Sequence, residues 1–246
     1  MAISLWDKSK NFGCIGTFTH FEELATILQK VSATEFTAMG EILYGSTSYK
    51  YSQTLYDENP FLHDRVSGGS RRYLASSAFE KFSEIFFQDK PDDDEYIKIL
   101  GRVENERTYR WAKRKYFTPP ENLDKYKVLL PKSNGSGAIG EVLSTPLIGY
   151  TETFISFGNF DTEAEAEACL KYLKSRFART MLGIVKVTQD NKTKEVWKYV
   201  PIQDFTQSSD IDWTATISEI DQQFYKKYNL DQSEIAFIEE KVKAME

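Results

Sequence analysis

Residues that build metal and redox sites are scarce in this chain of 246 residues. It has two cysteines and two histidines. Cys14 and Cys169 lie far apart and outside any ligand motif, so neither a disulfide framework nor a zinc site is expected. Both are interpreted as small buried hydrophobic residues. Because neither histidine has a neighbouring acidic pattern, the sequence also offers no histidine-based metal site or catalytic base.

Long apolar runs are missing as well. No run approaches the roughly 20 residues that a membrane span needs, and the first residues lack the layout of a signal peptide. We therefore expect a cytoplasmic protein with no membrane partner. A hydrophobic content of 41% with 14% aromatic residues is typical of an ordered globular chain, long enough for one large domain or two small ones.

The net charge of −6 argues against a general coat for nucleic acid, but the distribution of charge is uneven. Residues 98–132 hold ten Lys/Arg and four Asp/Glu, which gives +6 there and leaves −12 for the remainder. This basic band on an acidic body is a local electrostatic footprint of the kind that meets phosphate. An ordinary solvated strand does not normally concentrate one sign so strongly.

Two strands are expected in this band, over residues 95–102 and 107–117. In the second strand, alternation places two sets of side chains on opposite faces. One face carries Thr108, Arg110, Ala112, Arg114 and Tyr116, and the other carries Arg107, Tyr109, Trp111, Lys113 and Lys115. Trp111 suits either a core position or an aromatic platform for a base.

A short apolar strand, residues 126–131, leads into a loop of Lys132-Ser133-Asn134-Gly135-Ser136-Gly137. Gly135, Gly137 and Gly140 spell G-x-G-x-x-G, and Asp161 follows at the distance of a ribose-binding acid. A nucleotide site also needs a long helix after the loop, but only residues 141–145 precede Pro146. The loop is then either a plain connector between strands or, as we favour, a set of small donors for a nucleic-acid backbone.

The rest of the chain predicts a mixed α/β fold of the α+β class. A helix from Asp161 to about Met181 opens with a Thr162–Glu165 capping box, and strands are expected over residues 148–157 and 196–202. Two helices close the chain, one ending near Tyr228 and one capped by Asp231. We divide the chain into an N-terminal part (1–94), a recognition core with a mixed sheet and packed helices (95–206) and a C-terminal helical segment (207–246).

Several motifs, in this order, resemble the C-terminal target-recognition region of adenine-specific, type IIG-like restriction-modification DNA methyltransferases. They are Tyr126-Lys-Val-Leu-Leu-Pro-Lys-Ser-Asn-Gly-Ser-Gly137, Thr151-Glu-Thr-Phe154, Phe177-Ala-Arg179, Lys186-Val-Thr-Gln-Asp190, Trp197-Lys-Tyr-Val-Pro-Ile-Gln-Asp-Phe205 and Ser209-Asp-Ile-Asp-Trp213. The resemblance covers roughly residues 95–246. It implies a recognition domain that contacts double-stranded DNA, followed by helices.

The catalytic motifs of that family are not visible in the sequence. Asn59-Pro60-Phe61 is the nearest approach to the Asn/Asp-Pro-Pro-Tyr/Phe motif, and it lacks the second proline. Pro91-Asp92 has no acid-x-Lys strand at a usable distance for a nuclease. We therefore expect no cofactor in this chain. S-adenosylmethionine and Mg²⁺ would belong to a fused or partner methyltransferase or nuclease domain, and the chain is not expected to be an enzyme by itself.

The favoured function is sequence-specific binding of double-stranded DNA as the target-recognition module of a restriction-modification system. A divergent metal-dependent endonuclease using Asp92, Asp93, Asp94, Glu95 and Lys98, and a protein-interaction module with a basic patch, stay open as alternatives. The residues expected to contact DNA are Arg107, Arg110, Lys113, Arg114, Lys115, Lys132, Ser133, Asn134, Gly135 and Ser136.

Overall fold

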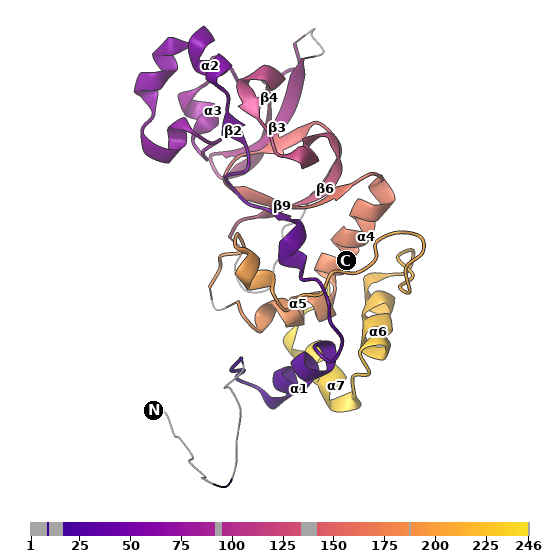
Figure 1. Ribbon diagram of the computed structural model, residues 1–246. Helices are drawn as coiled ribbons and strands as arrows, with labels where there is room; N and C mark the ends of the chain where they lie inside the picture. Colours follow the sequence, from indigo (N-terminus) through magenta and orange to yellow (C-terminus); the bar gives the residue numbers. More distant parts are fainter. Residues whose placement is uncertain (1–8, 10–16, 92–94, 134–141, 187, 246) are drawn as a thin grey trace.

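The computed structural model describes residues 9, 17–91, 95–133, 142–186 and 188–245. It confirms the α+β class, with helices and a mixture of antiparallel and parallel strand pairs. Two strands at the centre, β6 (Tyr126–Pro131) and β9 (Phe154–Phe160), divide the molecule. Strands β2, β3 and β4 lie on one side of them in Figure 1, and most of the helices lie on the other.

Two main sheets organise the strands. One has the order β1-β9-β6-β7 and is antiparallel, and the other has the order β4-β3-β8 with β3 and β8 parallel. A two-stranded pair, β2 with β5, stands beside them. The strands other than β6 and β9 are β1 (Leu43–Tyr44), β2 (Lys50–Tyr51), β3 (Tyr96–Val103), β4 (Glu106–Lys113), β5 (Phe117–Thr118), β7 (Val142–Ser144) and β8 (Ile148–Tyr150).

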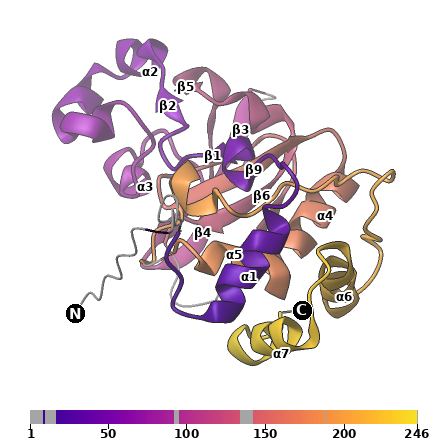
Figure 2. The same ribbon diagram turned by 60° about the horizontal axis from the view of Figure 1, so that its bottom comes forward.

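The helices cover the two sides of the central strands unequally. The α-helices are α1 (Glu22–Val31), α2 (Gln53–Glu58), α3 (Ala78–Lys81), α4 (Glu163–Lys174), α5 (Arg176–Gly183), α6 (Ile217–Lys227) and α7 (Gln232–Lys241). Helices α1 and α4 to α7 gather on one side, and α2 and α3 accompany β3 and β4 on the other (Figure 1). Turned by 60°, the molecule shows α1, α6 and α7 in front of the central strands (Figure 2).

Alternate side chains of β6 and β9 belong to two separate hydrophobic cores. Val128 and Leu130 pack with the helices, in a core that includes Tyr172, Phe177 and Phe224. Leu129, between them in sequence, belongs to the other core, which is rich in aromatic residues such as Phe79, Phe82 and Phe86. Because successive side chains of a strand point to opposite faces, six residues of β6 hold both cores together.

The pairing of β6 with β9 contains a bulge. Tyr126 pairs with Phe160 and Val128 pairs with Phe157, so two residues of β9 oppose Lys127 alone. Gly158, one of the two, has a φ of +89°, a conformation that glycine adopts without steric cost. The carbonyl of Gly158 accepts a hydrogen bond from Nδ2 of buried Asn122 at 2.9 Å. The bulge is thereby fixed to the short 3-10 helix η5 (Glu121–Asp124).

The capping box of Thr162 and Glu165 is confirmed at the start of α4. The expectation of one helix up to Met181 is wrong, because the chain breaks at Ser175. There ψ is 146°, and the Ser175 hydroxyl caps α5 by accepting a hydrogen bond from the Ala178 N–H at 3.1 Å. Serine competes in this way for backbone groups that a continuous helix would use. The apolar pattern continues across the break, because both helices pack on the same core.

Two strand predictions also need correction. Residues 148–157 form two strands, because Thr151 to Thr153 make a tight connection in which the Phe154 N–H donates to the Thr151 carbonyl. Residues 196–202 are not a strand. Their first part belongs to the 3-10 helix η6 (Lys194–Trp197), and Pro201 makes an isolated bridge to Ala38. Trp197 is buried there, with its indole N–H on the Asn191 carbonyl at 2.8 Å.

The predicted C-terminal helical pair is confirmed as α6 and α7. Both helices begin with a capping box, Thr216 with Glu219 and Asp231 with Glu234. Helix α7 also contacts α1, where the Lys30 amine binds the buried carboxylate of Glu234 at 2.6 Å. The boundaries proposed at residues 94 and 206 stay a prediction. Each hydrophobic core combines residues from both sides of residue 94.

Lys127, counted with the basic band in the sequence, is fully buried. Its amine donates hydrogen bonds to the carbonyls of Asn122, Leu123 and Lys125 at 2.9, 3.4 and 3.0 Å. These carbonyls belong to η5 and the residue that follows it, and those of Asn122 and Leu123 also accept the backbone N–H groups of Lys125 and Leu147. Burial lowers the pKa of Lys127 to about 7, although the nearby Asp124 carboxylate opposes the shift. Lys127 is therefore a structural residue and not a contact for phosphate.

The titration of Lys127 gives a test of this role. Its pKa of about 7 in the folded protein lies below the value of about 10.4 for an unfolded lysine. Between these values the unfolded chain binds more protons, so the free energy of unfolding should rise with pH, by about 2 kcal/mol from pH 6 to pH 8.5. Lys127→Met should lack this rise in urea unfolding experiments. Lys226→Met, the same change on an exposed helix position, should keep it. Parallel curves for Lys127→Met and wild type would contradict the assignment.

Candidate nucleic-acid interface

The predicted pair of basic strands is present as the β3–β4 hairpin. Eight residue pairs run from Tyr96↔Lys113 at the base to Val103↔Glu106 at the tip. Glu104 and Asn105 form the turn, both with positive φ (51° and 67°), as in the type I′ turns that match the twist of a hairpin. The first three pairs from the tip extend beyond β8, which pairs only with residues 98–100 of β3. The end of the hairpin is thus a two-stranded ribbon.

One face of the whole β3–β4 hairpin is basic and aromatic. Directly opposed residues of paired strands share a face, so the register groups the two strands into two sets. The set that we call the basic aromatic face consists of Tyr96, Lys98, Leu100, Arg102, Arg107, Tyr109, Trp111 and Lys113. Tyr96 and Leu100 are buried, and the six others are partly or fully exposed. Within these two described strands, this face has four cationic side chains and no carboxylate.

Aromatic rings and ammonium groups are interleaved on this face. The Lys98 amine lies 4.5 Å from the centre of the Tyr109 ring and 5.8 Å from that of Trp111. The Lys90 amine lies 5.8 Å from the same Trp111 ring. Phe87, which pairs with Trp111 through two backbone hydrogen bonds, adds a ring that is 40% exposed. Cation–π attraction holds the lysines over the rings. The result is a positively charged surface in which aromatic rings lie beneath the lysine amines.

The opposite face of the hairpin is a core face. Ile97, Ile99 and Ala112 are buried there against the aromatic core. Gly101 allows close contact, because a Cβ at this position would stand 2.5 Å from the Phe79 ring. Arg110 shares this face. Its guanidinium donates to the Tyr109 carbonyl and lies 5.9 Å from the centre of the Phe79 ring. Arg110 is therefore separated from Arg107 and Lys113.

Arg114 and Lys115 leave the strand and pair with acids. The β4 ladder ends at Lys113, and residues Arg114–Tyr116 form the 3-10 helix η4. Arg114 makes a bidentate contact with Asp124 at 2.6 and 2.7 Å, and Lys115 binds Glu58 at 2.6 Å. The Arg114 guanidinium holds the pKa of Asp124 below its usual value, and the Lys115 amine does the same for Glu58. The alternation expected to continue through residue 116 is wrong.

Lys132 and Ser133 lie at the end of β6, away from the β4 residues in sequence and in sheet order. The Lys132 N–H donates to the Thr153 carbonyl, and its own carbonyl accepts from the Asn191 N–H. Ser133 forms a bridge with Asp190. Asn134, Gly135 and Ser136 lie outside the described residues, as do Gly137 and Gly140. Strand β7 follows this loop where a nucleotide site would need a helix, and Asp161 forms an ion pair with Lys125.

Of the charged residues on this surface, Lys90, Lys98 and Arg102 were not among the predicted DNA contacts, and neither was Phe87. Lys98 was named only for the endonuclease alternative. For Lys98 and Arg102 the signal was present, because they alternate along the first strand as Arg107, Tyr109 and Trp111 do along the second. The sequence did not show which side chains of the first strand share a face of the hairpin with which side chains of the second strand. That depends on the position of the turn, and Glu104-Asn105 is a less familiar type I′ pair than Asn-Gly.

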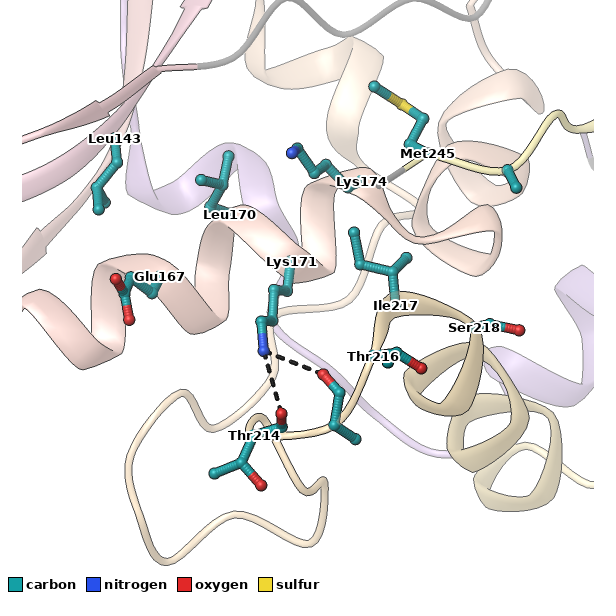
Figure 3. Close-up of a pocket in the computed structure, with 12 residues that line it drawn as sticks. Leu143, Glu167, Leu170, Lys171, Lys174, Thr214, Thr216, Ile217, Ser218 and Met245 are labelled. Atoms are coloured by element: carbon teal, nitrogen blue, oxygen red, sulfur yellow. Dashed lines mark hydrogen bonds between the residues drawn. The ribbon is translucent and has the colours of Figure 1, made fainter.

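A groove lies elsewhere, between α4 and the start of α6 (Figure 3). Its volume is about 740 Å³, and its lining is mainly apolar, with Leu143, Leu170 and Ile217. The Lys171 amine reaches the carbonyls of Thr214 and Ala215 at 3.5 and 3.0 Å, and that of Trp213 at 2.7 Å. This lysine fastens the segment before α6 to α4. Glu167, Lys174 and Ser218 also line the groove.

Other kinds of site find little support in the described part of the chain. There, no three His, Cys, Asp or Glu side chains gather as a metal ion requires. Asp92, Asp93 and Asp94 of the nuclease alternative lie outside it. Asn59 ends α2, and Pro60 begins a 3-10 helix, so Asn59-Pro60-Phe61 does not follow a strand. None of the helices described is both long and apolar enough to span a membrane.

Comparisons of the chain with protein-family models, with curated proteins and with solved structures found no match. The resemblance to target-recognition regions therefore rests on the motifs quoted from the sequence. Several of them occupy defined places in the fold. Tyr126 to Pro131 is β6, the central strand, and Phe177 and Arg179 lie on α5 in the helical core.

Stability measurements can test separately whether Trp111 lies at the surface and whether Trp197 lies in the core. Trp111→Ala should lower the free energy of unfolding by about 1–2 kcal/mol, because its ring is only half-buried. Trp197→Ala should cost about 3–5 kcal/mol, as expected for a fully buried tryptophan. Urea unfolding of the two variants gives both values. Equal losses would place Trp111 in the core and remove it from the interface.

Proposed function

We propose that this chain is a DNA target-recognition module of an adenine-specific restriction-modification system, and that it binds duplex DNA through the basic aromatic face of the β3–β4 ribbon. Lysine and arginine on this face contact phosphates and fix the register of the protein on the duplex. Side chains at the ribbon and its neighbouring loops read base edges. Methylation and cleavage are supplied by a separate domain or subunit.

The observation that carries this proposal is the segregation of charge on the ribbon. Lys98, Arg102, Arg107 and Lys113 share the face with two partly exposed aromatic rings, and the cores lie behind it. The major groove of B-DNA admits a two-stranded β-ribbon, and several known DNA-binding proteins use strands in this way. The two-stranded end of the hairpin, which carries Arg102 and Arg107, is therefore suited to the groove in shape as well as in charge. Lys98 and Lys113 lie farther from the tip on the same face.

The resemblance supports the same function from independent residues. Its motifs fall mainly on β6, α5, η6 and the segment before α6, whereas the ribbon charge was judged from β3 and β4. It also supports a division of labour, because the family methylates an adenine that leaves the duplex, and this requires a catalytic pocket of its own. S-adenosylmethionine and Mg²⁺ would be bound by the catalytic partner.

The first experiment measures the salt dependence of binding to a labelled duplex by fluorescence anisotropy. Lys98→Ala combined with Lys113→Ala should weaken binding to all sequences and reduce the slope of log K against log salt by about 1–2. Arg114→Ala combined with Lys115→Ala removes the same charge and is the matched control. Its slope should change little, because Asp124 and Glu58 already neutralise these side chains.

Melting temperatures of both double variants must be recorded, since the control breaks two ion pairs. Equal losses of slope in the two variants would show that binding is not localised to the ribbon. Equally tight binding of polyglutamate by the wild-type protein would favour the alternative of an acidic protein partner over DNA. Cleavage of the duplex with Mg²⁺ would favour the endonuclease alternative.

Sequence specificity is tested by selection from a pool of random duplexes. A recognition module should enrich a single short motif, because each wrong base pair typically costs about 1–3 kcal/mol. Wild-type protein that enriches no motif, while it still binds the pool, would reduce the proposal to non-specific DNA binding.

A further inference from the structure

A second group of cations lies outside the hairpin, in a segment to which the proposed function assigns no contact. Residues 72–74 run beside β2, and Tyr73 forms an antiparallel bridge with Lys50. The Tyr51 N–H donates to the Arg72 carbonyl at 2.9 Å. Lys50, Arg71 and Arg72 are all exposed. Because Arg71, Arg72 and Tyr73 are consecutive, the bridge places the backbone origins of three exposed cationic side chains close together. We call Lys50, Arg71, Arg72 and Tyr73 the β2 surface.

The loop that carries the two arginines is fixed to the body of the protein. The Tyr56 hydroxyl donates to the Arg71 carbonyl at 2.7 Å, and the Nε of Arg71 donates to the Val66 carbonyl at 2.7 Å. A Cβ at Gly69 would stand 2.5 Å from the Tyr73 hydroxyl oxygen, so the tyrosine lies against the backbone of the loop. A preorganised loop loses little conformational freedom when it binds a ligand.

The positive charge of the β2 surface is not neutralised by ion pairs. In the part of the chain that the structure describes, Lys50, Arg71 and Arg72 form no ion pair with a carboxylate. Three acids of the same region bind other groups: Lys115 and Tyr116 hold Glu58, Arg65 holds Glu84, and Ser76 holds Glu152. The three cations are therefore available to an external anion.

A single duplex is long enough to contact both positive surfaces. Strand β2 lies in the same half of the molecule as β3 and β4 (Figure 1). Lys113 ends the basic aromatic face, and Thr118, five residues later, pairs with Lys50. Five residues span at most about 18 Å, and paired strands are about 5 Å apart, so the backbones at Lys113 and Lys50 lie within about 23 Å of each other. One turn of B-DNA is longer, about 34 Å.

We propose that Lys50, Arg71 and Arg72 form a second phosphate-binding surface, which contacts the backbone of the duplex that the β3–β4 hairpin binds. The identity of the ligand rests on the proposed function. A guanidinium binds phosphate oxygens through a planar fork of N–H donors, and a lysine amine adds a point charge. Such contacts fix the position of a protein on DNA without reading its sequence. Inorganic polyphosphate has the same chemistry and is distinguished by experiment.

The test removes two charges without changing the hairpin. Lys50→Gln combined with Arg72→Gln should weaken duplex binding in fluorescence anisotropy and reduce the slope of log K against log salt by about 1–2. Lys226→Gln combined with Lys243→Gln removes two exposed lysines from the C-terminal helical segment and is the matched control. Its slope should equal that of wild type. Because all four side chains are exposed, the melting temperature should change little in either variant.

Selection from a pool of random duplexes gives an independent measurement. The Lys50/Arg72 double variant should enrich the same motif as wild type, because phosphate contacts carry no sequence information. A different motif would assign base contacts to these residues and contradict the proposal.

The outcomes separate this inference from the function on which it rests. If the Lys50/Arg72 variant has the same slope as its control while Lys98→Ala with Lys113→Ala loses affinity, the second surface is wrong and the hairpin interface stands. If the Lys50/Arg72 variant loses affinity and the Lys98/Lys113 variant binds normally, the second surface stands and the hairpin interface is wrong.

Two further ligands identify the anion. Wild-type protein that binds inorganic polyphosphate through Lys50 and Arg72 but binds no duplex would reject the assignment to DNA, and with it the proposed function. Polyglutamate that binds as tightly as duplex, and that the Lys50/Arg72 variant no longer binds, would overturn the phosphate assignment in favour of an acidic protein partner.

Discussion

The register of β6 against β9 is the constraint on which both halves of this molecule depend. Val128 and Leu130 face the helical core, and Leu129 faces the aromatic core. A slip of one residue would exchange these faces. It would also move the Lys127 amine from its three carbonyl acceptors into the helical core, where an ammonium without acceptors is strongly unfavourable. The two cores and one buried lysine therefore specify the same register, and the bulge at Gly158 accommodates it.

The short segment between β8 and β9 fixes the position of the β3–β4 hairpin relative to β6 and β9. Thr151 donates to the Leu100 carbonyl on one side, and Phe154 begins β9 on the other, so only three residues separate the two sheets. Behind the ribbon, Phe79 packs where Gly101 leaves space. A surface that reads DNA must present its donors in a fixed arrangement. Here the fixed arrangement follows from aromatic packing and a short connection.

Local patterns in the sequence predicted much of the fold and part of the surface. The hairpin strands, the capping box of Thr162 and the terminal helices follow from alternation and capping chemistry that neighbouring residues determine. The break at Ser175 and the end of β4 at Lys113 do not, because both depend on tertiary partners. Ser175 finds a use as the cap of α5, and the Arg114 N–H donates to the Glu95 carbonyl while its side chain reaches Asp124. Propensity is a weak guide where such partners compete.

The structure also changes which of the ten cations of the basic band, residues 98–132, belong to the basic aromatic face. Of its ten cations, Lys127 is buried, and Arg114, Lys115 and Lys125 are paired with Asp124, Glu58 and Asp161. Arg110 lies on the core face of the ribbon.

The excess of positive charge counted over residues 98–132 is therefore carried mainly by a few side chains on one face of the hairpin. The remainder of the chain has a net charge of −12. In the proposed complex, an acidic body would repel the DNA backbone wherever the ribbon is not in contact. Repulsion over most of the surface and attraction at the ribbon would limit non-specific binding and favour a single orientation on the duplex. For a recognition module, this restriction is as useful as the attraction itself.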